Sequence, residues 1–470
     1  MILAIIVVGT MMAAIDSTIV LLAFPTIVSG LHSNFLTIIW VILIYLLVVT
    51  VFTTQLGRIG DIFGRARIFN FGFLVFTVSS FMCGFAGSDV FLIVSRAIQA
   101  VGGAMMAANS GAIIADTFEP EERGRAFGFT SLGWTLGATL GIVLGGIITT
   151  FLGWRYIFFI NVPIGAVAFI LGWKFLRDSR KVHSRLDIIG MVLFGGAISL
   201  LSYSAIDSIA STFTVFHAFM IIAGIAALVA FVFWELHNKS PMLDLKQFKN
   251  RILRSSILAA FFQSLGYLAI IFLVIMYMQG VRGLSPFDAA MLLVPGYIVG
   301  SSLAPFMGKL SDKRGSREIA TLGIVSMCIA VLIYLMLTPT ISYYIWIIIF
   351  ASIASGVGSA MFFPSNNRAV MANAHEGSYG ATNGLLRTMS SLGIMFSFVL
   401  VISIAAHAIP KAEAFKIFVG TTTLIGNVSH TFMTGVYAAL YMSLIILIIA
   451  GVLSAARGKE PASQTAIRKR

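Results

Sequence analysis

Charged residues are scarce in this 470-residue chain, at 10% of its length, and cysteine is nearly absent. Soluble domains carry roughly a quarter charged residues, so the low charge excludes an ordinary soluble enzyme. The two cysteines, Cys83 and Cys328, stand in separate apolar segments, which excludes a disulfide framework and a cysteine metal motif. The sequence also contains no Walker loop, HExxH pair or nucleophile elbow. We therefore expect no ATP-driven transport, no metal site and no enzyme activity.

Hydrophobic residues make up 59% of the chain and are grouped in long runs. A helix needs roughly 20 apolar residues to cross a hydrocarbon layer about 30 Å thick. Fourteen runs meet this length, which predicts an all-α membrane protein with 14 transmembrane helices and no room for a soluble domain. The predicted segments are residues 3–24, 38–56, 69–87, 90–114, 127–150, 156–175, 188–207, 215–234, 255–278, 288–307, 319–338, 343–363, 381–405 and 432–455.

The 31 Lys and Arg residues exceed the 18 Asp and Glu residues and give a formal net charge of +13. In the fourteen-helix arrangement, 25 of the cations fall in alternate loops and the C-terminal tail, together with acids that include Asp187 and Glu235. Short loops rich in Lys and Arg stay in the cytoplasm. The pattern predicts a multi-pass protein of the cell membrane with both termini cytoplasmic. Because orientation explains the positive charge, we expect a lipid bilayer and no nucleic acid as partner.

The two ends of the chain repeat one another. Three residues of the first basic loop recur 251 positions later, since Gly57, Asp61 and Gly64 match Gly308, Asp312 and Gly315. Duplicated halves are typical of membrane carriers, which bind substrate between the halves. We predict an N-terminal six-helix half (1–180), two extra helices with a linker (181–250), a C-terminal six-helix half (251–456) and a cytoplasmic tail (457–470).

Several segments resemble a known family. Residues 57–67 (GRIGDIFGRAR) resemble the loop signature of the major facilitator superfamily. Residues 14–20 (AIDSTIV), 96–103 (RAIQAVGG) and 154–163 (WRYIFFINVP) resemble its fourteen-helix drug:proton antiporters. The resemblance covers nearly the whole chain and implies the major facilitator fold, a small-molecule substrate moved by alternating access, the proton as coupling ion and no other cofactor.

Asp16 is the one acid that the predicted segments place deep within a helix. Intramembrane acids usually face the protein interior and are functional by default. Asp16 is therefore a candidate site for a proton or a cationic substrate, and the alternative is a static helix anchor. Arg96 lies at a similar depth and is a candidate partner that tunes Asp16, a role that the family resemblance supports. Arg387, the second intramembrane cation, is a candidate contact for an anionic substrate or a cap of the inner cavity.

Glycines surround the acids of the repeated loops, which permits tight turns and close backbone approach. By resemblance, Asp61 and Arg65 form an inner gate, and the repeat extends the gating set to its C-terminal counterpart. The candidate gating residues are Gly57, Asp61, Gly64, Arg65 and Asp312. We interpret Asp116, in the next basic loop, as a solvated charge. The alternative for the whole set is a solvated loop that only fixes topology.

Small residues recur at a spacing of four in the fifth predicted helix, at Gly133, Gly137, Gly141 and Gly145, and Gly146 follows. Residues four apart share one helix face, and small residues there allow close helix packing. The family resemblance adds a second interpretation, a smooth sliding surface. In the antiporter motif Gly141 would be followed by proline, but here Ile142 follows, which leaves the direction of coupling open.

We predict a monomeric, proton-coupled exporter of amphipathic or cationic drugs. The alternatives are a major facilitator carrier for a metabolite, amino acid or siderophore, as exporter or symporter, and a non-transporting membrane receptor.

Overall fold

The computed structural model describes residues 1–178, 186–210, 214–374, 379–408 and 429–458. Within these ranges, 14 helical spans are long and apolar enough to cross a membrane, and no strand is present. The predicted all-α class with 14 transmembrane helices is confirmed for the described residues.

The first part of the chain forms seven helical segments, of which two share one span. They are α1 (Ile2–Gly30), α2 (Phe35–Phe63), α3 (Arg65–Gly84), α4 (Asp89–Thr117), α5 (Pro120–Phe151), α6 (Tyr156–Phe159) and α7 (Asn161–Phe175). We refer to α1–α7 as the N-terminal half.

Two further helices, α8 (Ile188–Ala210) and α9 (Val215–His237), precede the C-terminal half. A linker with the short 3-10 helix η1 (Leu245–Lys249) connects α9 to α10. The C-terminal half comprises α10 (Arg251–Met276), the π-helical turn η2 (Tyr277–Val281), α11 (Pro286–Arg314), α12 (Ser316–Tyr334), α13 (Tyr344–Ala372), α14 (Tyr379–His407) and α16 (Ser429–Ala456).

Local sequence signals set where several helices begin. The Asn34 side chain accepts a hydrogen bond from Thr37 N at the start of α2, and the Ser88 hydroxyl accepts one from Phe91 N at the start of α4. Such caps satisfy backbone N–H groups that a helix leaves free at its first turn. Proline occupies the first turn of α5 and α11, where its missing N–H has no cost. Within the apolar runs, the helix satisfies every other backbone group internally, as a bilayer requires.

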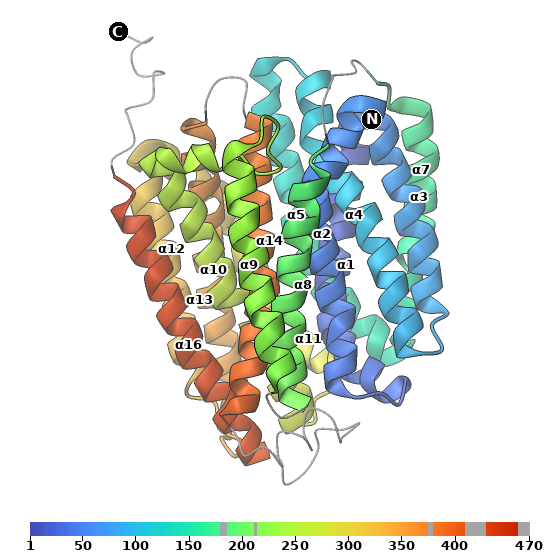
Figure 1. Cartoon of the computed structure of the whole chain (residues 1–470). Helices are drawn as coiled ribbons and strands as arrows, with labels where there is room; N and C mark the ends of the chain where they lie inside the picture. Colours follow the sequence, from blue (N-terminus) through green and yellow to red (C-terminus); the bar gives the residue numbers. More distant parts are fainter. Residues whose placement is uncertain (179–185, 211–213, 375–378, 409–428, 459–470) are drawn as a thin grey trace.

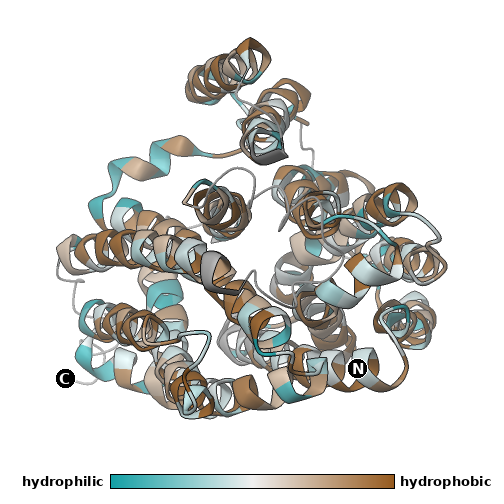
Figure 2. Cartoon of the chain, turned by 90° about the horizontal axis from the view of Figure 1, so that it is seen from below, coloured by the Kyte–Doolittle hydropathy of each residue, from teal (hydrophilic) through white to brown (hydrophobic). Residues whose placement is uncertain are grey.

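The first turn of α1, marked N, and the last turn of α16 lie at the same end of the bundle, the upper end in Figure 1. We call this the terminal end, where α1 begins and α16 ends, and the other the opposite end. Viewed along the helices, most ribbons are hydrophobic (Figure 2). In α9 only 17% of the most apolar window is buried by protein, so lipid is the natural solvent of its remaining surface.

Two boundaries differ from the prediction. The segment expected at 156–175 is divided into α6 and α7, which meet at Ile160. The segment expected at 255–278 begins earlier, at Arg251, and ends in the π-helical turn η2. Hydropathy locates the apolar run in both cases but does not register a local change of helix type. Most of the predicted tail, residues 459–470, lies outside the described part of the chain.

The extra pair packs beside both halves. Helix α8 contacts α9, α2 and α14, whereas α9 contacts α8 and η1. The pair therefore adds to the edge of the bundle at the junction of the two halves. The domain boundaries themselves stay a prediction.

The two halves contact one another at the opposite end. Gln279 Nε2 donates to Leu22 O at 3.0 Å, and Phe287 N donates to Thr150 Oγ1 at 3.0 Å. The Phe24 and Phe272 rings also pack edge-on, with centroids 5.1 Å apart. These contacts join the last third of α1 and the last turn of α5 to the end of α10, the turn η2 and the start of α11. The opposite end is thus closed between the halves.

Candidate functional site

Asp16 and Arg96 form an ion pair inside the N-terminal half. Arg96 Nη1 lies 2.6 Å from Asp16 Oδ2, and the two side chains are 2% and 0% exposed. Asp16 lies halfway along α1, and Arg96 lies two turns into α4. The sequence placed the two residues at a similar depth in the membrane, and in the structure they are in contact. A bare charge buried in this way would cost several kcal/mol, which the opposite charge offsets.

Two amides complete the surroundings of the Asp16 carboxylate. Gln99 Nε2 donates to Asp16 Oδ1 at 2.9 Å, and Asn161 Nδ2 approaches the same oxygen at 3.5 Å. Gln99 Oε1 also accepts from Arg96 Nη1 at 2.6 Å, so Gln99 bridges the two charges. Both amide side chains are fully buried. The sequence carried a partial signal for Gln99, which follows Arg96 by three positions and thus shares its helix face. No spacing rule linked Asn161, on α7, to Asp16.

Further contacts hold the Arg96 guanidinium. Arg96 Nε donates to Val41 O at 3.2 Å, and the Tyr45 ring centroid lies 4.4 Å from Arg96 Cζ. Both contacts come from α2, so Arg96 connects α4 to α1 and α2 at once. A guanidinium over an aromatic face gains a cation–π attraction that is strongest where water is excluded.

The Asp16 carboxylate is engaged by protein groups in this conformation. The carboxylate is completely enclosed, and donors already occupy both of its oxygens. Adding a proton to Asp16 would cancel its attraction for Arg96 and force three helices to rearrange their shared hydrogen bonds. The roles of Asp16 as a proton or substrate site and of Arg96 as its partner stay a prediction, and the contact between the two side chains is compatible with it.

The gating residues of the first repeat gather at the terminal end. Arg65 Nε lies 2.7 Å from Asp61 Oδ1, one helical turn away in sequence. Arg65 Nη1 also contacts both carboxylate oxygens of Asp116 at 2.9 Å. Asp116 is exposed, as expected for a solvated charge, and it also pairs with Arg65, because the last turn of α4 lies against the α2–α3 corner. The three side chains are about one quarter exposed.

The glycines of this corner have different tasks. Gly64 joins α2 to α3 with φ +116°, and its repeat Gly315 joins α11 to α12 with φ +94°. Backbone with positive φ favours glycine, which explains why the repeat keeps this residue. Gly57 is less constrained, since an added Cβ would lie 3.6 Å from Ala108 Cβ. The side chain of Asp312 lies outside the described part of the structure.

Arg387 is separate from the Asp16 pair. It lies eight residues after the first residue of α14, a helix that packs against α2, α8, α10 and α16. The side chain is nevertheless exposed, and none of the ion pairs among the described residues includes it. A polar stripe of the same helix accompanies it, formed by Asn383, Ser390 and Ser391, none of which is fully buried. Arg387 is thus an exposed cation on a helix that packs against both halves and the extra pair.

The glycine stripe of α5 packs on α1. A Cβ added to Gly137 would lie 2.7 Å from Met11 O and 2.9 Å from Ala14 Cβ, and one on Gly141 would lie 2.8 Å from Ile15 O. The same interface continues through Gly133, against Val7, and Gly145, against Ile19. Gly146 differs, because its neighbours are Pro286 and Ala290 of α11 in the other half. Small residues thus permit close backbone approach on two sides of α5.

Two helical halves, a buried ion pair between helices of one half and a contact between the halves at one end are features of a membrane carrier. A family model described as Major Facilitator Superfamily matches residues 6–398, which is most of the chain. The protein belongs to this family.

Relatives and solved structures agree with that assignment. The chain is 30% identical over 434 residues to the riboflavin transporter RibZ of Clostridioides difficile (strain 630), covering 91% of this chain and 93% of the relative. It is 29% identical to multidrug resistance protein 3 of Bacillus subtilis (strain 168), covering 82% and 76%. A bacterial homologue of the human lysosomal transporter Spinster, solved in an inward-facing and unoccupied conformation, shares the fold with a TM-score of 0.68, 18% identity and coverage of 100% and 98%.

Proposed function

We propose that this transporter exports amphipathic compounds, cationic drugs among them, in exchange for protons, with both termini in the cytoplasm. The single observation that carries the proposal is the enclosed Asp16–Arg96 pair, at 2.6 Å, with side chains that are 0% and 2% exposed. Supporting it, relatives of similar identity over most of the chain include a multidrug resistance protein. The proton is the coupling ion in this proposal, and the protein works as a monomer.

Helix α1 supplies the mechanical link. Asp16 and Leu22 lie on α1 six residues apart, about 9 Å along the axis. Leu22 O accepts the Gln279 hydrogen bond that helps to close the opposite end. When the halves part at the opposite end, Asp16 takes up a proton from that side, which weakens its attraction for Arg96 and releases the substrate. After the halves meet there again, the proton leaves Asp16 toward the terminal end and the pair with Arg96 is restored, so protons and substrate move in opposite directions.

The test is transport in proteoliposomes of known orientation. With ethidium as probe, we expect accumulation only when a pH gradient is present and in the direction opposite to proton movement. Movement of dye and protons in the same direction would establish symport and contradict exchange. Absence of substrate-dependent flux for every probe would favour the receptor alternative.

A second candidate function, export of anionic or acceptor-rich metabolites, is favoured by Arg387. Its exposed guanidinium provides up to five hydrogen-bond donors and a fixed positive charge. A relative named as a riboflavin transporter is in keeping with an acceptor-rich substrate. On this hypothesis the protein prefers a flavin or carboxylate over a dye cation.

Arg387→Gln separates the two candidates. If Arg387 binds substrate acceptors, the variant raises the apparent KM for riboflavin at least tenfold, the loss of roughly one charge-assisted hydrogen bond, and leaves ethidium transport unchanged. Arg282→Gln, at a loop of the opposite end, is the matched control. An equal decrease for both probes would show that Arg387 maintains the structure rather than selecting substrate.

A further inference from the structure

Two more acids are buried at the terminal end, outside the Asp16 site. Asp187 is 4% exposed and Glu235 is 1% exposed. Both were placed among loop acids from the sequence, but Asp187 directly precedes α8 and Glu235 lies in the last turn of α9. A Cβ built on Gly190 would lie 2.7 Å from Asp187 Oδ2 and 2.7 Å from Glu235 Oε1. The two carboxyl groups therefore border the same small space.

Donors from three elements hold the Asp187 carboxylate. Gly190 N and Trp234 Nε1 donate to its Oδ1, each at 2.9 Å. Asn238 Nδ2 donates to its Oδ2 at 2.8 Å, and Met242 N does so at 3.1 Å. Burial alone would raise the pKa of Asp187, but these hydrogen bonds outweigh it and hold that pKa below its usual value. Asp187 is thus the ionised member of the pair.

Glu235 shares one of those donors. Met242 N lies 3.1 Å from Glu235 Oε1, the same distance as from Asp187, so a single N–H points between the two acids. Leu243 N donates to Glu235 Oε2 at 2.9 Å. The hydrogen bonds described for Glu235 thus come from two backbone N–H groups, one of them shared with Asp187. Glu235 stabilises a negative charge less well than Asp187 does, so the proton is expected to reside on Glu235.

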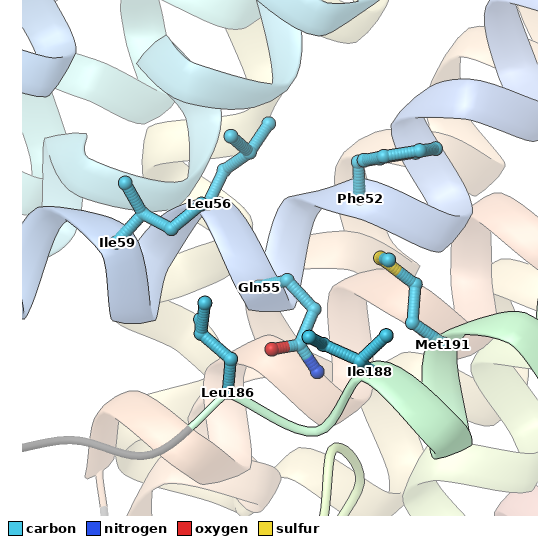
Figure 3. A pocket seen from close by; sticks show the side chains of 7 residues that line it. All are labelled: Phe52, Gln55, Leu56, Ile59, Leu186, Ile188 and Met191. Atoms are coloured by element: carbon cyan, nitrogen blue, oxygen red, sulfur yellow. The ribbon is translucent and has the colours of Figure 1, made fainter.

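Helix α2 is tied to the same site. The Gln55 side chain makes two hydrogen bonds with the Asp187 backbone, donating to its carbonyl and accepting from its N–H at 3.2 Å each. Arg58 donates to Ser240 O at 3.0 Å and also to Pro241 O. Gln55 borders a pocket of about 100 Å³ together with Leu186 and Ile188, from the segment that leads into α8 (Figure 3).

Among the described residues, the charges near the pair balance when the two carboxyl groups share one proton. Arg58 is the cation that faces both acids, so a doubly ionised pair would leave one buried negative charge uncompensated. The other described charged groups nearby are engaged or exposed: Asp61 pairs with Arg65, and His237 and Lys239 are exposed. A single proton shared between the two carboxyl groups makes the cluster neutral.

We propose that Asp187, Glu235, Gln55 and Arg58 form a proton-dependent clasp that fixes α8, α9 and the following linker to α2. With the proton on Glu235, the linker stays folded against the pair. When the proton leaves to solvent, the two carboxylates repel one another and the linker opens. Because residues 238–250 connect the N-terminal half and extra pair to α10, the clasp sets how freely the C-terminal half moves at high pH.

The test is hydrogen exchange of the full-length protein in lipid nanodiscs over a pH series. Protection of the Met242 and Leu243 amides, corrected for base-catalysed exchange, should fall by about tenfold per pH unit above the pKa of the pair, as for an opening that releases one proton. Glu235→Gln keeps the shape of the side chain and cannot lose the proton. We expect this variant to remain protected across the whole series.

Asp244→Asn, in the same linker, is the matched control and should retain the wild-type pH profile. Protection that is independent of pH in the wild type would overturn the proposal. An unchanged pH profile in Glu235→Gln would overturn it as well, since another group would then govern the opening. If Glu235→Gln lost protection at all pH values, the closed linker would require ionised Glu235. That result would also overturn the proposal, which requires protonated Glu235.

Discussion

Asp16→Asn is expected to lower the free energy of unfolding by about 3–5 kcal/mol and to abolish coupling of transport to protons. The substitution keeps the acceptor for Gln99 but removes the negative charge that lies 2.6 Å from Arg96 Nη1. The guanidinium, 2% exposed, is then left as an uncompensated charge in a region of low dielectric constant. Thermal unfolding in detergent measures the first effect, and gradient-driven flux in proteoliposomes the second.

The double variant Asp16→Asn with Arg96→Gln distinguishes coupling from anchoring. Removing both charges leaves no buried charge uncompensated, so most of the lost stability should return. Proton coupling should not return, because the titratable group is still missing. Recovery of both properties would show that the pair is a static anchor. Asp89→Asn, which alters an acid at the start of α4, is the matched control and should leave coupling unchanged.

Gly137→Ala is expected to destabilise the protein and to impair transport by about tenfold or more, because the added Cβ would lie 2.7 Å from Met11 O and 3.0 Å from Met11 Cα. Backbone atoms cannot turn aside as a flexible side chain does, so α1 and α5 must separate. Separation moves α1 away from the position in which Asp16 meets Arg96. Flux and the unfolding temperature of the purified variant measure the effect.

Gly128→Ala provides the control on the same helix. A Cβ at Gly128 meets nothing within 4 Å, and alanine favours a helix over glycine by about 1 kcal/mol. This variant should be at least as stable as the wild type and fully active. If Gly137→Ala behaved in the same way, close packing of α1 on α5 would not be needed for transport.

The spans and the main ion pair could be predicted because they depend on local or one-dimensional information. Each apolar run is long enough to cross a bilayer, and the depths of Asp16 and Arg96 follow from counting residues along two helices. The fully buried Asn161 could not be found in this way. Its role near Asp16 depends on how α7 rotates against α1, which no periodicity in either helix specifies.

Gly146 and Glu235 show two other limits. Gly146 follows Gly145 by one residue, which turns it about 100° around the helix, so it faces α11 rather than α1. The apolar run of α9 ends near Glu235, and hydropathy alone therefore assigns this acid to a loop. Its burial arises because the chain folds back seven residues later and offers the Met242 amide.

Proton release on substrate binding tests the central claim most directly. Purified wild-type protein in weakly buffered solution is mixed with ethidium while a pH indicator follows free protons. Exchange through Asp16 predicts that binding to the wild type releases protons, and that Asp16→Asn binds the dye without release. Equal proton release from both proteins would contradict the account, because the coupled proton would then reside on another group.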